Sequence, residues 1–217
     1  MDYQGPDAVD IRNTRALNRA YLAAIRPTSD VGDATGRTLT ELQARRLSMT
    51  PFLLFSLREQ DVEFWEEVLA DDPQADLLET VASPAIHELQ VSALGFLWQL
   101  SRQRPYVARL VSGATANWCD RLSALTLVEL IRMAAPRSDL IVPRFPEGDK
   151  VIDRLLQSGV SAQRNLQEMS QQFALQAMLT RSRPPRYEKL PAAACDRSTP
   201  VRQVAERVGL RTLNSKV

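Results

Sequence analysis

The cationic side chains of this sequence gather in its last 37 residues, where their chemistry is the neutralisation of phosphate or other anions. Residues 181–217 contain nine Arg or Lys and three Asp or Glu, a net charge of +6. Residues 1–180 contain 18 basic and 23 acidic residues, a net charge of −5. The overall charge of +1 therefore conceals a basic tail on an acidic body. This separation is typical of a chain that meets a polyanion at one end and another partner elsewhere.

We expect the tail cations to contact DNA, because phosphate neutralisation needs only mobile cations and strengthens as salt is lowered. The cations of the proline-rich linker are Arg181, Arg183, Arg186, Lys189 and Arg197, and those of the terminal segment are Arg202, Arg207, Arg211 and Lys216. The alternative for the linker cations is a solvated basic segment without a ligand.

The terminal segment also contains a short motif for DNA contact. Thr199 is a suitable N-cap, Pro200 suits the first helical position, and Ala205 and Gly209 have the spacing of the first helix and turn of a helix-turn-helix. The recognition helix would then begin near Arg211. The alternative is an amphipathic C-terminal helix whose valines pack on the body or on a partner.

Residue types for catalysis or metal binding are sparse. His87 is the single histidine, and Cys119 and Cys195 are the two cysteines, too few for a four-ligand zinc site within the chain. No nucleophile motif or glycine-rich phosphate loop is present, and the chain has eight glycines. We therefore expect neither an enzyme nor a bound metal or cofactor. Cys119 is expected in the core, with a redox or intersubunit role as the alternative.

An acidic stretch lies between Arg58 and Arg102, which contains ten Asp or Glu and no basic residue. Such a surface would repel DNA. It contains our candidates for partner binding, which are Trp65, Glu63 and Glu66. A solvated helix face and a core position for Trp65 are the alternatives.

The hydrophobic periodicity predicts an all-α fold. Helices are expected at 10–25, after a Thr38 cap with Glu41 at its third position, at 60–70, at 84–102, from Pro105, at 115–124, at 126–135, and twice within 149–179 with a break at 158–159. Two short apolar runs, 52–55 and 140–142, suit either a strand or a helix end. No apolar run is long enough to span a membrane and no signal peptide is evident, so we expect a cytoplasmic protein without membrane contact.

A weak internal repeat relates the two halves of the body. Shifting the chain by 88 residues places 38–42 on 126–130 and the apolar run 52–54 on 140–142. A shift of 77 places Ala16–Leu17 on Ala93–Leu94, so the second copy is about 11 residues longer upstream. Coincidence is the alternative, because capping boxes are common. A real repeat predicts two helical units, 1–82 and 83–180, packed as a pseudo-dimer, followed by the basic segment 181–217.

The repeated unit resembles the FlhD family, the smaller subunit of the bacterial flagellar master activator. The resemblance rests on Leu94–Leu97, on the segment Ser123–Leu130 and on Leu140–Phe145, which ends in Arg144 and Phe145. In the first copy, Asp10–Arg12 and Tyr21–Leu22 resemble the opening helix of the family. The duplication and the basic tail depart from the family pattern.

The resemblance implies a function as well as a fold. Members of the family are all-helical, dimerise, and join a zinc-binding partner subunit to bind promoter DNA and recruit RNA polymerase. By this resemblance the chain would be a transcriptional regulator subunit that binds duplex DNA, assembles with an FlhC-like zinc-binding partner and with RNA polymerase, and forms an oligomer. The alternative is a helical adaptor or scaffold protein without DNA contact.

Overall fold

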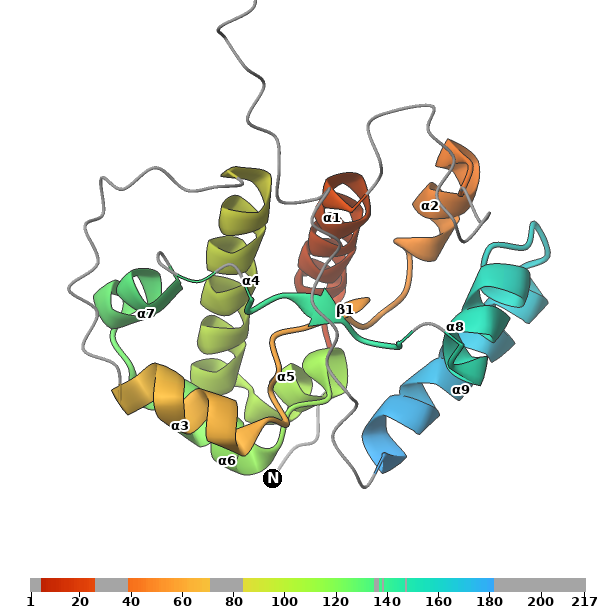
Figure 1. Cartoon of the computed structure of the whole chain (residues 1–217). Helices are drawn as coiled ribbons and strands as arrows, with labels where there is room; N and C mark the ends of the chain where they lie inside the picture. Colours follow the sequence, from red (N-terminus) through yellow and green to blue (C-terminus); the bar gives the residue numbers. More distant parts are fainter. Residues whose placement is uncertain are drawn as a thin grey trace, which may run out of the picture.

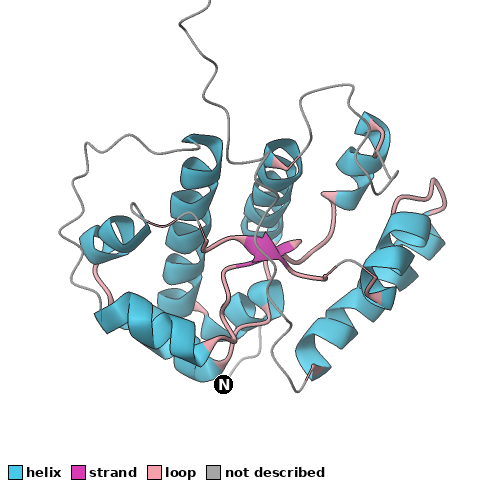
Figure 2. Cartoon of the chain, in the orientation of Figure 1, coloured by secondary structure: helices cyan, strands magenta, loops and turns pink. Residues whose placement is uncertain are grey.

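The computed structural model describes residues 5–25, 39–70, 84–134, 137, 139–146 and 148–181, and these residues are mostly helical (Figures 1 and 2). The helices are α1 (Ala8–Ala24), α2 (Glu41–Leu47), α3 (Val62–Ala70), α4 (Pro84–Gln103), α5 (Pro105–Ser112), α6 (Ala116–Ala124), α7 (Leu127–Ala134), α8 (Lys150–Arg154), the π-helical turn η1 (Leu155–Gly159) and α9 (Arg164–Thr180). The helical class is confirmed, and most of these helices lie within one or two residues of their expected ranges. The expected break at 158–159 is wrong: η1 continues the helix through Gly159, and residues 160–163 separate it from α9. None of the described helices is long and apolar enough to cross a membrane.

Side-chain caps define where several helices begin. The Asp7 carboxylate accepts hydrogen bonds from the backbone N–H groups of Val9 and Asp10 and caps α1. Helix α2 is capped by Thr40, whose hydroxyl accepts from the Gln43 N–H. The sequence predicts a capping box formed by Thr38 and Glu41, and this prediction is wrong by two residues. The N-cap is Thr40, and Glu41 is the first helical residue. Thr38 lies outside the described residues.

The two short apolar runs each end in a short strand, and the two strands pair at the centre of the molecule (Figures 1 and 2). Strands β1 (Phe55–Ser56) and β2 (Val142–Pro143) are antiparallel, with Phe55 opposite Pro143 and Ser56 opposite Val142. The side chains of residues 52–55 and 57 are almost completely buried. A continuous apolar run of this length is what a strand covered on both faces requires, and periodicity alone does not separate it from a buried helix end.

The two halves of the body exchange their last helices across this strand pair. Helix α3, which follows β1, packs on α6, where the rings of Trp65 and Trp118 lie 5.4 Å apart between centroids. In the opposite sense, η1 contacts α2. An Arg46 guanidinium N–H of α2 donates to the Val160 carbonyl just after η1, at 3.1 Å. Figure 1 shows α3 and α7 on one side of the strand pair, and α2, α8 and α9 on the other.

One hydrophobic core runs through both halves. Helices α1 and α4 pack directly against each other, and the core includes residues of each half, from Leu17 and Phe52 to Leu97 and Leu140. The described residues of 1–82 and 83–180 therefore share one core.

Candidate nucleic-acid and partner interfaces

Arg181 is the one predicted DNA-contacting residue that lies within the described part of the chain. Its guanidinium forms an ion pair with Asp149, the N-cap of α8, and lies 5.9 Å from the centroid of the Phe145 ring. Arg181 is thus held against the body by this ion pair, and its contact with DNA stays a prediction. The other predicted DNA contacts, the helix-turn-helix segment and Cys195 lie in 182–217, outside the described residues.

Trp65 is a core residue, so its expected role in partner binding is wrong. Its side chain is 3% exposed, and its indole N–H donates to the Leu57 carbonyl at 3.0 Å. The physical reason is that α3 lies on α6 and turns this face of the helix toward Trp118.

The other two candidates of α3 are at the surface. Glu63 and Glu66 are exposed together with Glu67, and we call these three residues the acidic face of α3. Glu66 accepts a hydrogen bond from Arg121 at 3.3 Å, an exposed pair that contributes little to stability. The acidic face is therefore exposed, and its binding of a basic partner stays a prediction.

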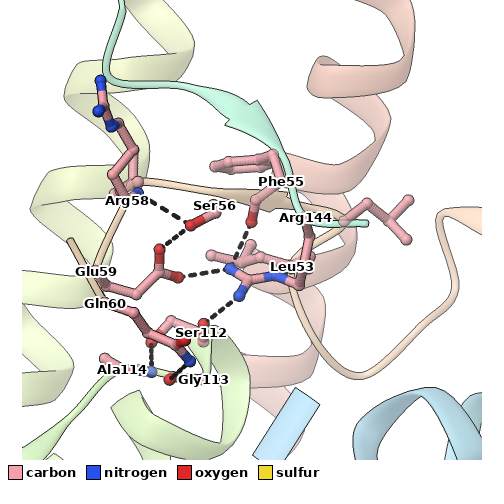
Figure 3. Close-up of polar contacts among 12 residues, drawn as sticks. Leu53, Phe55, Ser56, Arg58, Glu59, Gln60, Ser112, Gly113, Ala114 and Arg144 are labelled. Carbon is pink, nitrogen blue, oxygen red and sulfur yellow. Dashed lines mark hydrogen bonds and ion pairs between the residues drawn. The ribbon is translucent and has the colours of Figure 1, made fainter. Parts of the chain in front are cut away.

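A buried arginine, Arg144, connects the strand pair to neighbouring segments through hydrogen bonds (Figure 3). Its side chain is 6% exposed and donates hydrogen bonds to the carbonyl oxygens of Leu53, Phe55 and Ser112. The same guanidinium pairs with the Glu59 carboxylate at 2.6 Å. Because Leu53 and Phe55 belong to the first half and Ser112 ends α5, one side chain joins three segments that are distant in the sequence.

Glu59 is satisfied from two sides in this cluster. One carboxylate oxygen accepts from Arg144, and the other accepts from the Ser56 hydroxyl. A buried ion pair needs this degree of hydrogen bonding to offset its desolvation. Every polar group of the cluster is thus turned inward, and the arrangement is structural rather than reactive. Arg144 carries part of the FlhD resemblance, whereas no sequence pattern indicates that Glu59 is its partner.

An open groove runs along the surface where α1 and α4 meet. It has a volume of about 640 Å³, and its α1 side includes the alanines Ala16, Ala20 and Ala23, which face Leu89 and Phe96 of α4. Small side chains on one helix leave room for another helix or an apolar ligand. Periodicity did not reveal this groove, because alanines on an exposed helix face give no strong apolar signal.

Cys119 lies in the core, as expected. It is 1% exposed, and burial raises the pKa of its thiol, so the unreactive neutral form is favoured. Within the described ranges, no group of three His, Cys, Asp or Glu side chains is placed to hold a metal ion.

Comparison of this chain with protein-family models, with curated proteins and with solved structures gives no match. Three features of the chain itself therefore bear on function: the strand pair with Arg144, the acidic face of α3, and the cations of the tail and body.

Proposed function

We propose that this chain is an FlhD-like subunit of a transcriptional regulator, and that its body is a covalent pseudo-dimer. In this proposal the basic tail binds promoter DNA, and the body contacts an FlhC-like zinc-binding partner subunit and RNA polymerase. The partner contact falls on the acidic face of α3.

The register of the strand pair is the observation that carries the proposal. Phe55 lies opposite Pro143, a separation of 143 − 55 = 88 residues, which is the shift that aligns the two apolar runs in the sequence. In a two-fold dimer, a residue at the axis faces its own copy, and its neighbours pair in the reverse order. The antiparallel pair of β1 and β2 has this relation, so it supports a two-fold arrangement of two similar units.

Helices α2 and α7 support the same correspondence. Their N-caps are Thr40 and Thr126, and each is followed four residues later by a buried apolar residue, Ala44 in α2 and Leu130 in α7. The two N-caps are 86 residues apart in the sequence, as are the two buried apolar residues, whereas the paired strand residues Phe55 and Pro143 are 88 apart. The second copy therefore has two additional residues between its helix and its strand.

Charge supports the assignment of DNA to one side and a partner to the other. The tail, with its net charge of +6, leaves the body at Arg181, which is paired with α8. Helix α3, which carries the acidic face, lies across the strand pair from α8 (Figure 1). A polyanion attracted by the tail would thus be kept away from the surface that repels it.

The test compares the full chain with a chain that ends after Arg181. We expect the full chain to bind duplex DNA at about 100 mM salt. The truncated chain should bind more weakly and with a smaller salt dependence, while its circular dichroism spectrum stays unchanged because Arg181 and its ion pair are retained. Binding that is unchanged after truncation would remove the tail from the proposal, and no binding by the full chain would overturn the function.

The groove between α1 and α4 favours a second candidate, a helical adaptor that binds an amphipathic helix without contacting DNA. An adaptor should elute free of nucleic acid and give no shift of duplex DNA at the same salt concentration. Binding of duplex DNA by the full chain therefore distinguishes the regulator from the adaptor.

A further inference from the structure

Three arginines form one stripe along α1. Arg12, Arg15 and Arg19 are spaced by three and four residues, so they lie on the same side of the helix over a length of about 10 Å. Arg12 and Arg19 are exposed, and Arg15 is half-buried.

Helix α2 adds a fourth cation to this surface. Arg45 is exposed and lines the same groove of about 340 Å³ as Arg19, between α1 and α2. Arg15 donates a hydrogen bond from its Nε to the Met49 carbonyl, at 3.3 Å, just after the end of α2. These four arginines of the neighbouring helices α1 and α2 are called the basic ridge (Arg12, Arg15, Arg19 and Arg45).

The charge of the ridge is largely uncompensated. Within the described ranges, Arg12, Arg19 and Arg45 have no ion pair, and Glu41 is the one acidic residue that lines the groove between α1 and α2. Four other arginines of the body, by contrast, each pair with a carboxylate: Arg58, Arg104, Arg121 and Arg144. Like charges collected without partners create a positive potential that attracts an anion.

The fold itself does not require these arginines. At the shift of 77 residues, the α4 positions that correspond to Arg12, Arg15 and Arg19 are Leu89, Ser92 and Phe96. Helix α4 of the second half therefore has no cation at the three corresponding positions; its one arginine, Arg102, lies in its last turn. The basic character of α1 is a property of one half alone, as expected for a surface with a ligand.

We propose that the basic ridge binds the phosphates of duplex DNA, as a contact separate from that of residues 182–217. This inference rests on the proposed function, because it assigns a second surface to the same ligand. One DNA strand has a phosphate about every 3.4 Å along the axis, so a 10 Å stripe spans about three phosphates. The planar guanidinium suits phosphate because it donates two parallel hydrogen bonds.

The test uses the full chain and a labelled DNA duplex of mixed sequence. The ridge variant is Arg12→Ala/Arg19→Ala/Arg45→Ala, which leaves Arg15 and its hydrogen bond to Met49 intact. The control variant removes the same charge from other exposed positions, with Arg109→Ala/Arg132→Ala/Arg164→Ala.

We expect the ridge variant to bind at least about tenfold more weakly than the control at about 100 mM salt. Its plot of log K against log salt should be shallower by about 2.7, since each lost phosphate contact removes about 0.9. A third variant, with lysine at positions 12, 19 and 45, keeps the charge and should retain most of the salt dependence. It also separates loss of charge from loss of folding.

Two results would overturn the inference. Equal affinity and salt dependence of the ridge and control variants, with strong binding by the unmodified chain, would leave DNA contact to the tail alone and the proposed function intact. No binding by the unmodified chain would overturn the inference and the proposed function together.

Discussion

At the scale of single residues, the stability of the strand pair depends on Arg144. Its guanidinium satisfies three backbone carbonyls and the Glu59 carboxylate in a buried site. Removing one partner of such a pair leaves an uncompensated charge, which costs far more than the pair itself contributes.

We expect Arg144→Met to lower the free energy of unfolding by about 3–5 kcal/mol. The double variant Arg144→Met/Glu59→Gln should be less destabilised than the sum of its single variants, because no buried charge remains. Urea denaturation of the four proteins measures the coupling. Additive losses would show that Arg144 and Glu59 act independently.

A second prediction concerns Gly113, which ends α5 with a left-handed conformation at φ 71°. A Cβ there would lie 2.9 Å from the Met178 Cγ. We expect Gly113→Ala to destabilise the protein by at least about 1 kcal/mol, through backbone strain and displacement of Met178. The matched control is Gly95→Ala within α4, where a Cβ meets nothing within 4 Å. The control should stabilise by about 0.5–1 kcal/mol, and a shift of the same sign in both would contradict this explanation.

The sequence predicts the roles of individual residues less well than it predicts the helices. Arg144 stands out through the family resemblance, but its partners are backbone carbonyls, which no sequence pattern identifies. Trp65 illustrates the opposite error, since an aromatic residue among acidic neighbours suggests an interface until α6 is seen to cover it. The basic ridge was missed because Arg45 joins Arg19 through tertiary packing rather than through spacing.

At the scale of elements, the cap of α1 makes stability depend on pH. The pKa of Asp7 is lowered, chiefly by the hydrogen bond from the Asp10 backbone N–H, with further contributions from Val9 and Arg104. A depressed pKa in the folded state stabilises the protein above the unfolded value of 3.8, and this stabilisation is lost as the pH falls through the folded pKa.

We therefore expect Asp7→Asn, which still caps a helix but does not titrate, to flatten the loss of stability below about pH 4. The melting temperatures of the variant and the unmodified protein, compared across an acidic pH series, measure this loss of stability. Parallel curves for the variant and the unmodified protein would show that Asp7 does not contribute to the acid sensitivity.

Most elements were predictable because each carries its own signal of apolar spacing and a cap. Helices α4, α6 and α7 follow the expected ranges closely, and Thr126 with Glu129 forms the predicted capping box. The segments 52–55 and 140–142 were ambiguous, since each is apolar on both sides. Their extended form depends on pairing with each other across 88 residues, which is information that no local window contains.

At the scale of the whole molecule, the exchange of helices across the strand pair makes the two halves interdependent. Helix α3 of the first half packs on α6, and η1 of the second packs on α2. If the body is the covalent pseudo-dimer that we propose, it gains the interface of a dimer without the entropic cost of association.

We expect residues 5–181 to unfold in a single cooperative transition, with tryptophan fluorescence and helical circular dichroism changing together. A fragment of residues 1–82 should be largely unfolded, because it lacks the partners of α1 and α3. Two separated transitions, or a folded fragment, would contradict the shared core.

To test whether this chain works at promoter DNA, we would map where the full chain binds on the chromosome of cells that express it. Crosslinking, capture of the tagged chain and sequencing of the bound DNA should give discrete sites upstream of genes. These sites should weaken in the variant that ends after Arg181 and in the ridge variant. A uniform background indistinguishable from that of an untagged strain would contradict the claim and leave the helical adaptor as the function.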